Sequence, residues 1–517
     1  MIEGDPLTGA DVAVVGGGFG GLSAASYLAD AGADVTLLER NDRLGGAANV
    51  IEEDGFRFDT GPSWYLMPDV FERFFGHFDR EPTDYYELTR LDPQYRVFFD
   101  DDPPAAAGQA PGDHGEYVDV TADTDQVRRL FAAYEDDGGA AFDGYLAEAE
   151  HTYEVGMEQF VYEDRSRFRD LLDPAVVRCG PGLTLLGSMQ DHVESYVDSR
   201  RLQQLLQYTL VFLGGSPHNT PALYNLMAHV DYNLGVYYPE GGIFGVVQAL
   251  AKLNRELGAT IRTGSEVTAI DPLSEGLAVE TGGDYRQFDA VVANANPAHV
   301  EQDLLTSVDG SGWDDRTYAP SALLFYLGVE GEVDPLEHHT LVFPEDWDPH
   351  FESIFEDPGW PEDPAYYLSV ASKTDDTVAP EGHHAVVILL PIAPGLEDGP
   401  EVREQYREKL LTHLAETTGV DLRDRIVLER SACVSEFADR YRYPQGSALG
   451  LAHTLRQTGP LRPSHYSDVD GLYYTGSYVE PGIGMPMTLV SGEHAAEAVV
   501  EDWTGGPIRS MLPGVGD

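Results

Sequence analysis

The sequence predicts an α/β fold in which a nucleotide-binding domain built on a parallel sheet is interrupted by an inserted α+β substrate domain. Three observations lead to this prediction. A glycine-rich turn lies between an apolar strand and a helix at residues 11–31, a helix and short strands occupy residues 243–293, and a glycine-dense turn precedes an apolar helix near residue 487. The first domain is expected at residues 8–75, 236–297 and 430–503, and the second at residues 76–235 and 298–429.

The N-terminal turn is the strongest of these signals. Asp11–Val15 is a short apolar run typical of a buried parallel strand, and the turn Gly16–Gly21 follows it directly. Leu22–Ala31 has a helical composition, and Asp34–Leu38 predicts a second strand that ends at Glu39. A Gly-x-Gly-x-x-Gly run alone is a weak signal. Here its strand, helix and acidic residue complete a Rossmann-like dinucleotide-binding motif.

Each residue of this motif has a physical role. Gly16 permits the tight turn, Gly18 lets the backbone approach a pyrophosphate, and Gly21 allows the helix to pack closely on the strand. The free amide groups at the helix N-terminus then face the phosphates. Glu39 can accept hydrogen bonds from ribose hydroxyls. These four residues are therefore predicted to bind a cofactor.

The residues after the second strand indicate which dinucleotide is bound. The order Glu39-Arg40, then Arg43 and Gly46, gives a short, basic, glycine-rich turn near the expected pyrophosphate. This order resembles the FAD-dependent amine oxidase and phytoene desaturase superfamily, and Phe58–Ser63 matches that superfamily's turn into the flavin site. The resemblance implies FAD as the cofactor, with Arg40, Arg43 and Gly46 among the residues that bind it.

A second segment is expected to rejoin the nucleotide-binding domain. Its helix is predicted at residues 243–257, and its strands at 260–263, 267–271, 277–280 and 289–293. This order resembles the second cofactor-binding block of FAD oxidoreductases. The resemblance implies that the backbone of Val267 lies on the adenine side of the cofactor.

The C-terminal segments narrow the family. The relevant runs are Ser321–Gly328, Gln457–Pro463, Gly471–Ser477 and Glu480–Gly492. In this order, and with the N-terminal turn, they resemble the phytoene-desaturase type of FAD-dependent carotenoid desaturase over most of the chain. In that family a turn equivalent to Gly476 lies beside the flavin and Pro481–Thr488 wraps its ring edge. Gly476 and Met487 are therefore expected to bind the cofactor, ahead of a helix over residues 487–500.

The resemblance implies a reaction but leaves the substrate open. A carotenoid desaturase introduces C=C bonds into a long polyene, and FAD carries the redox step. Phytoene-type enzymes have a Thr-His-Pro-Gly-Gly-Gly run where this chain has Val479–Gly484. This departure favours 3,4-desaturation of a 1-hydroxy-2-isopentenyl carotenoid on the way to a C50 carotenoid (bacterioruberin). Desaturation of phytoene to lycopene is the alternative, and the electron acceptor is not predicted.

Two other classes of protein stay open. A non-enzymatic prenyl or lipid carrier could use the same fold, although the intact glycine turn and Glu39 disfavour it. An amine oxidase would turn over amines instead of polyenes. No catalytic side chain is predicted, and Asp231 and Glu240 are only weak candidates for a base. The pairs His338-His339 and His383-His384 predict no metal site, because adjacent side chains of a strand point to opposite faces.

The composition excludes further classes. The chain has 517 residues, with 89 acidic against 32 basic ones, and a formal net charge of −57. Its 42% hydrophobic content excludes a disordered acidic protein. Its charge excludes nucleic acid as a partner. Many carboxylates with very few lysines are typical of salt-in halophiles, where molar salt shortens the Debye length to about 3 Å.

The sequence also bears on location. No signal peptide and no apolar run of the roughly 20 residues that span a bilayer are recognised. We therefore expect a cytoplasmic protein that is peripheral to the cell membrane, where a carotenoid substrate dissolves. Cys179 and Cys433 are expected to be buried reduced thiols, with a disulfide as the alternative. Asp101–Gly115 is expected to be an exposed insertion.

Overall fold

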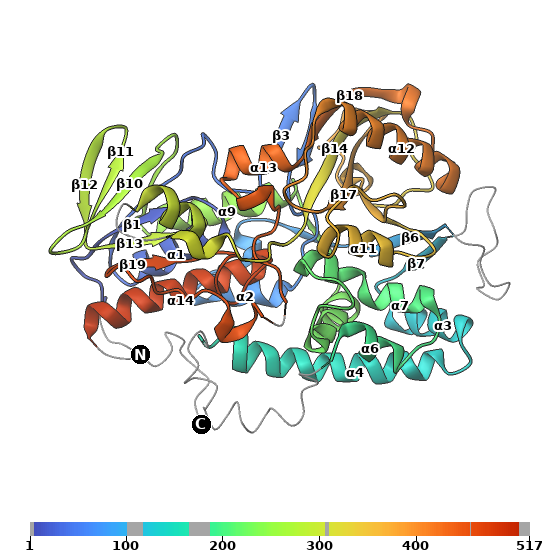
Figure 1. Cartoon of the computed structure of the whole chain (residues 1–517), viewed down its shortest axis with the longest axis horizontal. Helices are drawn as coiled ribbons and strands as arrows, with labels where there is room; N and C mark the ends of the chain where they lie inside the picture. Colours follow the sequence, from blue (N-terminus) through green and yellow to red (C-terminus); the bar gives the residue numbers. More distant parts are fainter. Residues whose placement is uncertain (1–4, 101–116, 165–186, 306–309, 455, 506–517) are drawn as a thin grey trace.

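The structure is a computed structural model that describes residues 5–100, 117–164, 187–305, 310–454 and 456–505. The predicted insertion Asp101–Gly115 and Cys179 lie outside the described residues. Two sheets lie side by side, and a helical layer lies beneath the right-hand one (Figure 1). The predicted combination of a parallel-sheet domain and an α+β domain is confirmed.

The first sheet is parallel and carries the predicted nucleotide-binding motif. Its strand order is β19-β13-β1-β2-β9, and every neighbouring pair is parallel. The strands are β1 (Asp11–Val15), β2 (Asp34–Leu38), β9 (Thr260–Arg262), β13 (Ala290–Ala293) and β19 (Leu472–Tyr474). Such strands are buried on both faces, which explains why the sequence reads as continuous apolar runs rather than alternation.

Helices cover one face of this sheet and a small antiparallel sheet covers the other. The helices are α1 (Phe19–Asp30), α9 (Ile243–Glu256) and α14 (Met485–Thr504), which share one apolar core. The small sheet comprises β10 (Val267–Pro272), β11 (Leu277–Thr281) and β12 (Asp284–Phe288). Strand β12 was not predicted, because four of its five residues are exposed and give no apolar signal.

The second sheet is mixed and has the order β18-β14-β17-β16-β15-β6-β7. Its strands are β6 (Tyr95–Phe99), β7 (Tyr117–Val120), β14 (Ser321–Glu330), β15 (His339–Phe343), β16 (Tyr366–Ser369), β17 (His383–Ile392) and β18 (Ile426–Ala432). Helix α12 (Pro400–Thr418) packs on this sheet, α13 (Val434–Tyr441) contacts β14 and β18, and α11 (Asp348–Phe355) lies between the sheet and the helical layer. Strand β18 crosses the boundary expected at residue 430 and belongs to this sheet. The hairpin of β3 (Val50–Glu53) and β4 (Phe56–Asp59) also packs on it.

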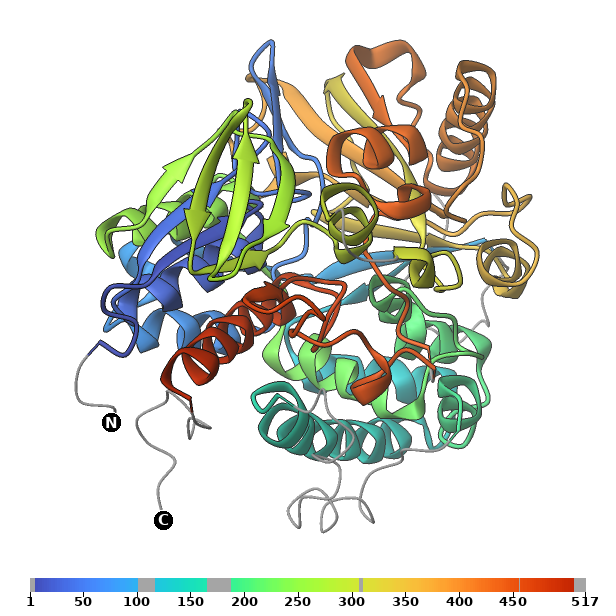
Figure 2. The same cartoon turned by 60° about the vertical axis from the view of Figure 1, so that its left-hand side comes forward.

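The helical layer forms a third apolar core. It contains α3 (Thr124–Tyr134), α4 (Gly138–Gly156), α6 (Met189–Glu194), α7 (Arg200–Gln207) and α8 (Leu226–Ala228). The remaining elements with three or more residues are α2 (Pro68–His77), α10 (Pro297–His299), β5 (Leu88–Arg90) and β8 (Tyr237–Pro239), besides short 3-10 and π turns. Helix α14 lies beneath the parallel sheet with its N-terminal end toward this layer (Figure 2), and its Val490 belongs to the layer's core.

Two further observations concern the predictions on location and cysteine. Within the described ranges, no helix combines the length and apolarity needed to cross a bilayer. Cys433 is a buried free thiol at the N-terminus of α13.

Candidate functional site

The turn between β1 and α1 can be made only by glycine. Gly16 has a φ of +100° and its N–H donates to the carbonyl of Leu38 at 2.8 Å. A Cβ on Gly21 would lie 2.0 Å from the carbonyl oxygen of Gly16, so any side chain there pushes the helix away from the strand. A Cβ on Gly18 would lie 2.7 Å from the amide of Asn294. The backbone is therefore open to a ligand that approaches the helix N-terminus.

The carboxylate of Glu39 is held against this turn. It accepts hydrogen bonds of 2.8 Å from the N–H of Gly17 and from the backbone and side-chain amides of Asn41. Glu39 follows β2 directly and is 5% exposed. Its position at the carboxyl edge of the parallel sheet is the one from which an acidic residue reaches a ribose.

Two adjoining cavities open at this edge of the sheet. The first, which we call the turn cavity, holds about 110 Å³. Its lining includes Gly16, Gly17, Gly18, Glu39, Arg40, Gly46, Val267, Asn294 and residues 440–443. The second, which we call the apolar cavity, holds about 340 Å³ and shares Gly18, Gly46 and Asn294 with the first. A long ligand can therefore run from one cavity into the other.

The apolar cavity lies where the parallel sheet, the mixed sheet and the helical layer meet. Its lining includes Trp64, Val211, Leu324, Tyr367, Leu389, Phe437, Tyr478, Ile483 and Met485. Polar groups come from hydroxyls, backbone and the Asn294 amide. Among the described residues that line it, none is Asp, Glu, Lys, Arg or His.

Most of the predicted cofactor residues meet at these cavities. Gly16, Gly18, Glu39, Arg40, Gly46 and Val267 line the turn cavity, and Gly476 lines the apolar cavity. Gly21 lines neither cavity but contacts the Gly16 carbonyl, where the absence of a side chain lets α1 pack on β1. Their contacts with FAD stay predictions.

Arg43 and Met487 are placed differently from the expectation. Arg43 lines neither cavity, because its guanidinium turns to the hairpin and lies 3.2 Å from the carboxylate of Glu52. Helix α14 begins at Met485, two residues earlier than predicted, so Met487 packs on the core of the helical layer. Its neighbours Met485, Pro486 and Thr488 line the apolar cavity instead.

The sequence interpretation missed Asn294. This residue follows β13, and its side chain lies beneath the turn. A Cβ on Gly18, Gly20 or Gly476 would approach its amide atoms to 2.7–2.9 Å. A polar residue directly after an apolar parallel strand is the signal that could have found it, because ligands of such sheets bind at the carboxyl ends of the strands.

A buried arginine shapes the loop that faces the apolar cavity. Arg462 is 3% exposed and donates to the carbonyls of Leu451, Gln457, Ser477 and Val479 at 2.5–3.3 Å. Burial raises the pKa of Glu480 to about 7, and the nearby Arg462 guanidinium opposes this shift. His453 accepts a hydrogen bond from the N–H of Ile483 at 3.1 Å. Together these contacts position the loop over residues 477–484.

Neither weak candidate for a base reaches the cavities. Glu240 is exposed, and Asp231 is buried at 2% exposure in the helical layer, where it accepts a 2.8 Å hydrogen bond from Tyr95. Burial raises the pKa of Asp231 to about 7, although hydrogen bonds from Tyr95 and Tyr208 lower it. No carboxylate among the described lining residues of the apolar cavity is available as a base.

The raised pKa of Asp231 predicts a pH-dependent stability. An unfolded Asp titrates near pH 3.9, so the folded protein binds the extra proton between about pH 4 and pH 7 and loses stability as the pH rises through that window. We expect Asp231→Asn to remove this loss, which is at most roughly 1.4 kcal/mol per pH unit. Chemical denaturation of the wild type and of Asp231→Asn from pH 4 to pH 8 measures the free energy of unfolding. Glu240→Gln, at an exposed carboxylate, is the control. A difference between wild type and Asp231→Asn that does not change with pH would contradict the assignment.

The adjacent histidines are placed differently from the sequence argument. His338 precedes β15 instead of lying within it, so its ring contacts that of His339 with centroids 4.5 Å apart. Their Nδ1 atoms pair with the hydroxyls of Thr374 and Tyr367 at 2.7 Å. Both rings are buried and stack among aromatic side chains, which accounts for them as core residues.

The geometry fits a dinucleotide that carries an apolar ring system. The turn accommodates a pyrophosphate only because side chains are absent at Gly16, Gly18 and Gly21, and Glu39 stands where a ribose would lie. The adjoining apolar cavity accommodates a flat, uncharged ring. The fold and the site therefore define a flavin-binding oxidoreductase of the Rossmann type.

Comparison with known proteins gives the family. The family of flavin containing amine oxidoreductases matches residues 19–500. A carotenoid 3,4-desaturase of Haloarcula japonica is 59% identical over 96% of this chain and 99% of its own length. A 4,4'-diapophytoene desaturase of Staphylococcus aureus is 30% identical over 95% of this chain and 99% of its own length. The protein therefore belongs to the flavin containing amine oxidoreductases, among the carotenoid desaturases, and its cofactor is FAD.

A solved structure supports the fold. An oxidoreductase from Methanosarcina mazei superimposes with a TM-score of 0.58 at 18% sequence identity, over 94% of this chain and all of the other.

Proposed function

We propose that this protein is an FAD-dependent carotenoid 3,4-desaturase that acts on a 1-hydroxy-2-isopentenyl carotenoid in the formation of a C50 carotenoid. The observation that carries the proposal is the uncharged apolar cavity beside the glycine turn. A polyene end fits such a lining, whereas an amine cation would find no counter-charge there. The 59% identity to a carotenoid 3,4-desaturase supports the same substrate class.

The reaction requires little from the side chains. A new C=C bond forms when one carbon loses a hydride and its neighbour loses a proton. FAD, when bound, supplies the hydride acceptor. The apolar lining orients the chain and excludes water. Because the described lining offers no Asp, Glu, Lys, Arg or His side chain, we assign no residue to the proton.

The size of the cavity favours a bond near one end of the substrate. A volume of about 340 Å³ is at the small end of the roughly 300–1,000 Å³ typical of ligand sites. Since the flavin ring would take part of this volume, the remainder holds one end of a long polyene rather than its whole length. A 3,4 bond is close to the chain end, so only that end has to reach the flavin.

Desaturation of phytoene is the second candidate function. The 30% identity to a 4,4'-diapophytoene desaturase favours it. Mass spectrometry of the products separates the two candidates. We expect the hydroxylated isopentenyl carotenoid to lose two hydrogens per turnover and phytoene to be recovered unchanged. The opposite pattern would make the protein a phytoene desaturase.

The charge-free lining predicts a large effect of one added carboxylate. Val211→Asp is expected to lower kcat/KM for the carotenoid by about 10–100-fold, because an apolar chain then has to desolvate a charge at a cost of roughly 1–3 kcal/mol. The matched control is Val427→Asp, since Val427 is 55% exposed and is not part of this lining. The flavin content should stay that of the wild type in both proteins. Equal turnover by the two variants would exclude this cavity as the polyene site.

We also infer that the protein works at a membrane surface, because its proposed substrate dissolves in lipid. Flotation with lipid vesicles tests this inference. With a net charge of −57, we expect binding to neutral vesicles in molar salt and little binding to anionic vesicles at low salt. A protein that stays in the aqueous fraction under both conditions would refute it.

A further inference from the structure

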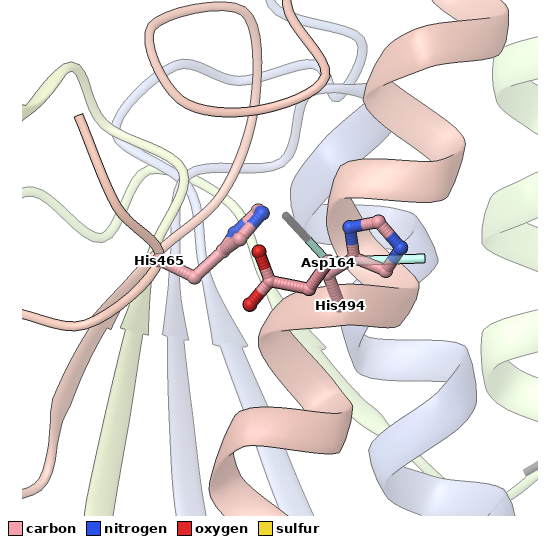
Figure 3. A group of neighbouring side chains, drawn as sticks. All are labelled: Asp164, His465 and His494. Atoms are coloured by element: carbon pink, nitrogen blue, oxygen red, sulfur yellow. The ribbon is translucent and has the colours of Figure 1, made fainter. Parts of the chain in front are cut away.

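Three side chains outside the two cavities converge in a way that the proposed reaction does not explain. They are Asp164, which follows the turn after α4, His465, which lies in the loop before β19, and His494, which is in α14. One ligand atom from each lies within 4.8 Å of the others. In Figure 3 the Asp164 carboxylate points toward the His465 ring, and the His494 ring lies across from them on its helix.

The two histidines lack the partners that buried rings need. His465 and His494 are 0% and 3% exposed. The Nδ1 of His465 pairs with the carbonyl of Tyr474 at 3.0 Å, whereas its Nε2 and both nitrogens of His494 have no hydrogen-bond partner. The ring centroids are 5.4 Å apart and nearly perpendicular. In the neutral rings, His465 Nε2 and one nitrogen of His494 each carry a lone pair, and these two buried lone pairs can ligate a cation.

The geometry points to a site for one divalent transition-metal cation, held by Asp164, His465 and His494. Imidazole and carboxylate ligands suit ions such as Zn²⁺ and Fe²⁺. The hydrogen bond of His465 Nδ1 to a backbone carbonyl fixes the tautomer that leaves Nε2 free to ligate, as outer-shell partners of metal-bound histidines do. Metal–ligand bonds of about 2.0–2.2 Å require the three atoms to approach one another by roughly 1 Å.

The scaffold around the site is already fixed. Arg73 makes two hydrogen bonds with Glu493, at 2.6 and 2.9 Å, and its guanidinium lies over the ring of Tyr162 at 4.2 Å. These contacts hold the backbone two residues before Asp164 against α14. The hydrogen bond from Tyr474 N–H to the His465 carbonyl, 2.8 Å, fixes the second ligand to β19. A bound cation would thus join the helical layer to the nucleotide-binding domain.

The charges around the site favour a cation. Burial is the main cause of the raised pKa of Glu480, and repulsion from Asp164 adds to it, so the two carboxylates lie close enough to interact. The guanidinium of Arg462 opposes this effect at Glu480, and that of Arg73 is paired with Glu493. A divalent ion could be ligated by the Asp164 carboxylate without protonating either histidine.

Zinc binding by the full-length, FAD-loaded protein in molar salt tests the site. After treatment with a chelator and dialysis against buffered micromolar Zn²⁺, we expect one zinc per chain by elemental analysis. His494→Gln and Asp164→Asn should each lower the affinity more than about 100-fold, beyond the roughly 10–100-fold effect of losing an outer-shell partner. Zn²⁺ should also raise the Tm of the wild type and not that of the variants.

The control variant is His218→Gln, which removes an exposed histidine that lies 3.5 Å from Asp348. It should bind zinc like the wild type, which shows that surface carboxylates do not hold the metal. Retained flavin absorbance shows that each variant is folded. If the buried substitution His494→Gln prevents folding, the zinc affinity of Asp164→Asn decides the test. Wild-type protein without zinc, or equal zinc in all four proteins, would overturn the assignment. Neither outcome depends on carotenoid turnover.

Discussion

Gly21→Ala is expected to yield a protein that no longer holds FAD. The new Cβ would lie 2.0 Å from the Gly16 carbonyl oxygen and 3.1 Å from the Asn294 side chain, so α1 has to move away from β1. Such overpacking costs roughly 1–3 kcal/mol or more. The turn that would carry the pyrophosphate moves with the helix. We expect at least a tenfold weaker FAD affinity, which corresponds to about 1.4 kcal/mol, as measured by flavin titration.

Gly76→Ala is the matched control, because Gly76 is also a helical glycine. It is exposed in α2, and a Cβ there meets nothing within 4 Å. This variant should bind FAD like the wild type and gain up to roughly 0.5–1 kcal/mol in stability. Normal FAD affinity in Gly21→Ala would show that the close approach of α1 to β1 does not matter for the cofactor.

Arg462→Met is expected to have the largest effect on stability. Its guanidinium bonds four backbone carbonyls and lies beside the buried Glu480. Removing it leaves these groups without their partner, and breaking a buried charge pair costs about 3–5 kcal/mol. The loop 477–484 that lines the apolar cavity should loosen, and flavin should be lost with it. Chemical denaturation followed by tryptophan fluorescence measures the change.

Two variants locate the cause of this effect. In Arg423→Met the lost arginine also makes a bidentate pair, with Asp421, but on the surface. We expect almost no change in the free energy of unfolding there. Arg462→Met combined with Glu480→Gln should regain part of the loss, because the unpaired buried carboxyl is then neutral. Equal destabilisation by the two arginine variants would mean that burial of Arg462 is unimportant.

Those parts of the site that are local in sequence could be predicted. The strand, turn and helix over residues 11–30 read clearly because apolar runs, glycine spacing and Glu39 all lie within a short stretch. The same holds for the helix and strands over residues 243–293. In contrast, β12 is an exposed strand that carries no apolar pattern, and the boundary at residue 430 falls inside β18, whose partner strand is distant in sequence.

Other features depend on tertiary contacts that no local pattern reveals. Arg43 turns to Glu52 because the neighbouring hairpin offers a carboxylate. Met487 points away from the apolar cavity because α14 starts two residues earlier than its composition suggests. The side chain of Asn294 lies close to glycines of two other segments of the chain. Asp164 meets His465 and His494 although some 300 residues of chain separate them.

The most direct test is an anaerobic one. Purified FAD-loaded protein in molar salt is mixed with the hydroxylated isopentenyl carotenoid, with phytoene and with a diamine, and the flavin absorbance is followed. We predict that the flavin bands bleach with the hydroxylated carotenoid alone, because a neutral polyene end fits the uncharged cavity next to the flavin. Bleaching by the diamine without any bleaching by either carotenoid would contradict the account.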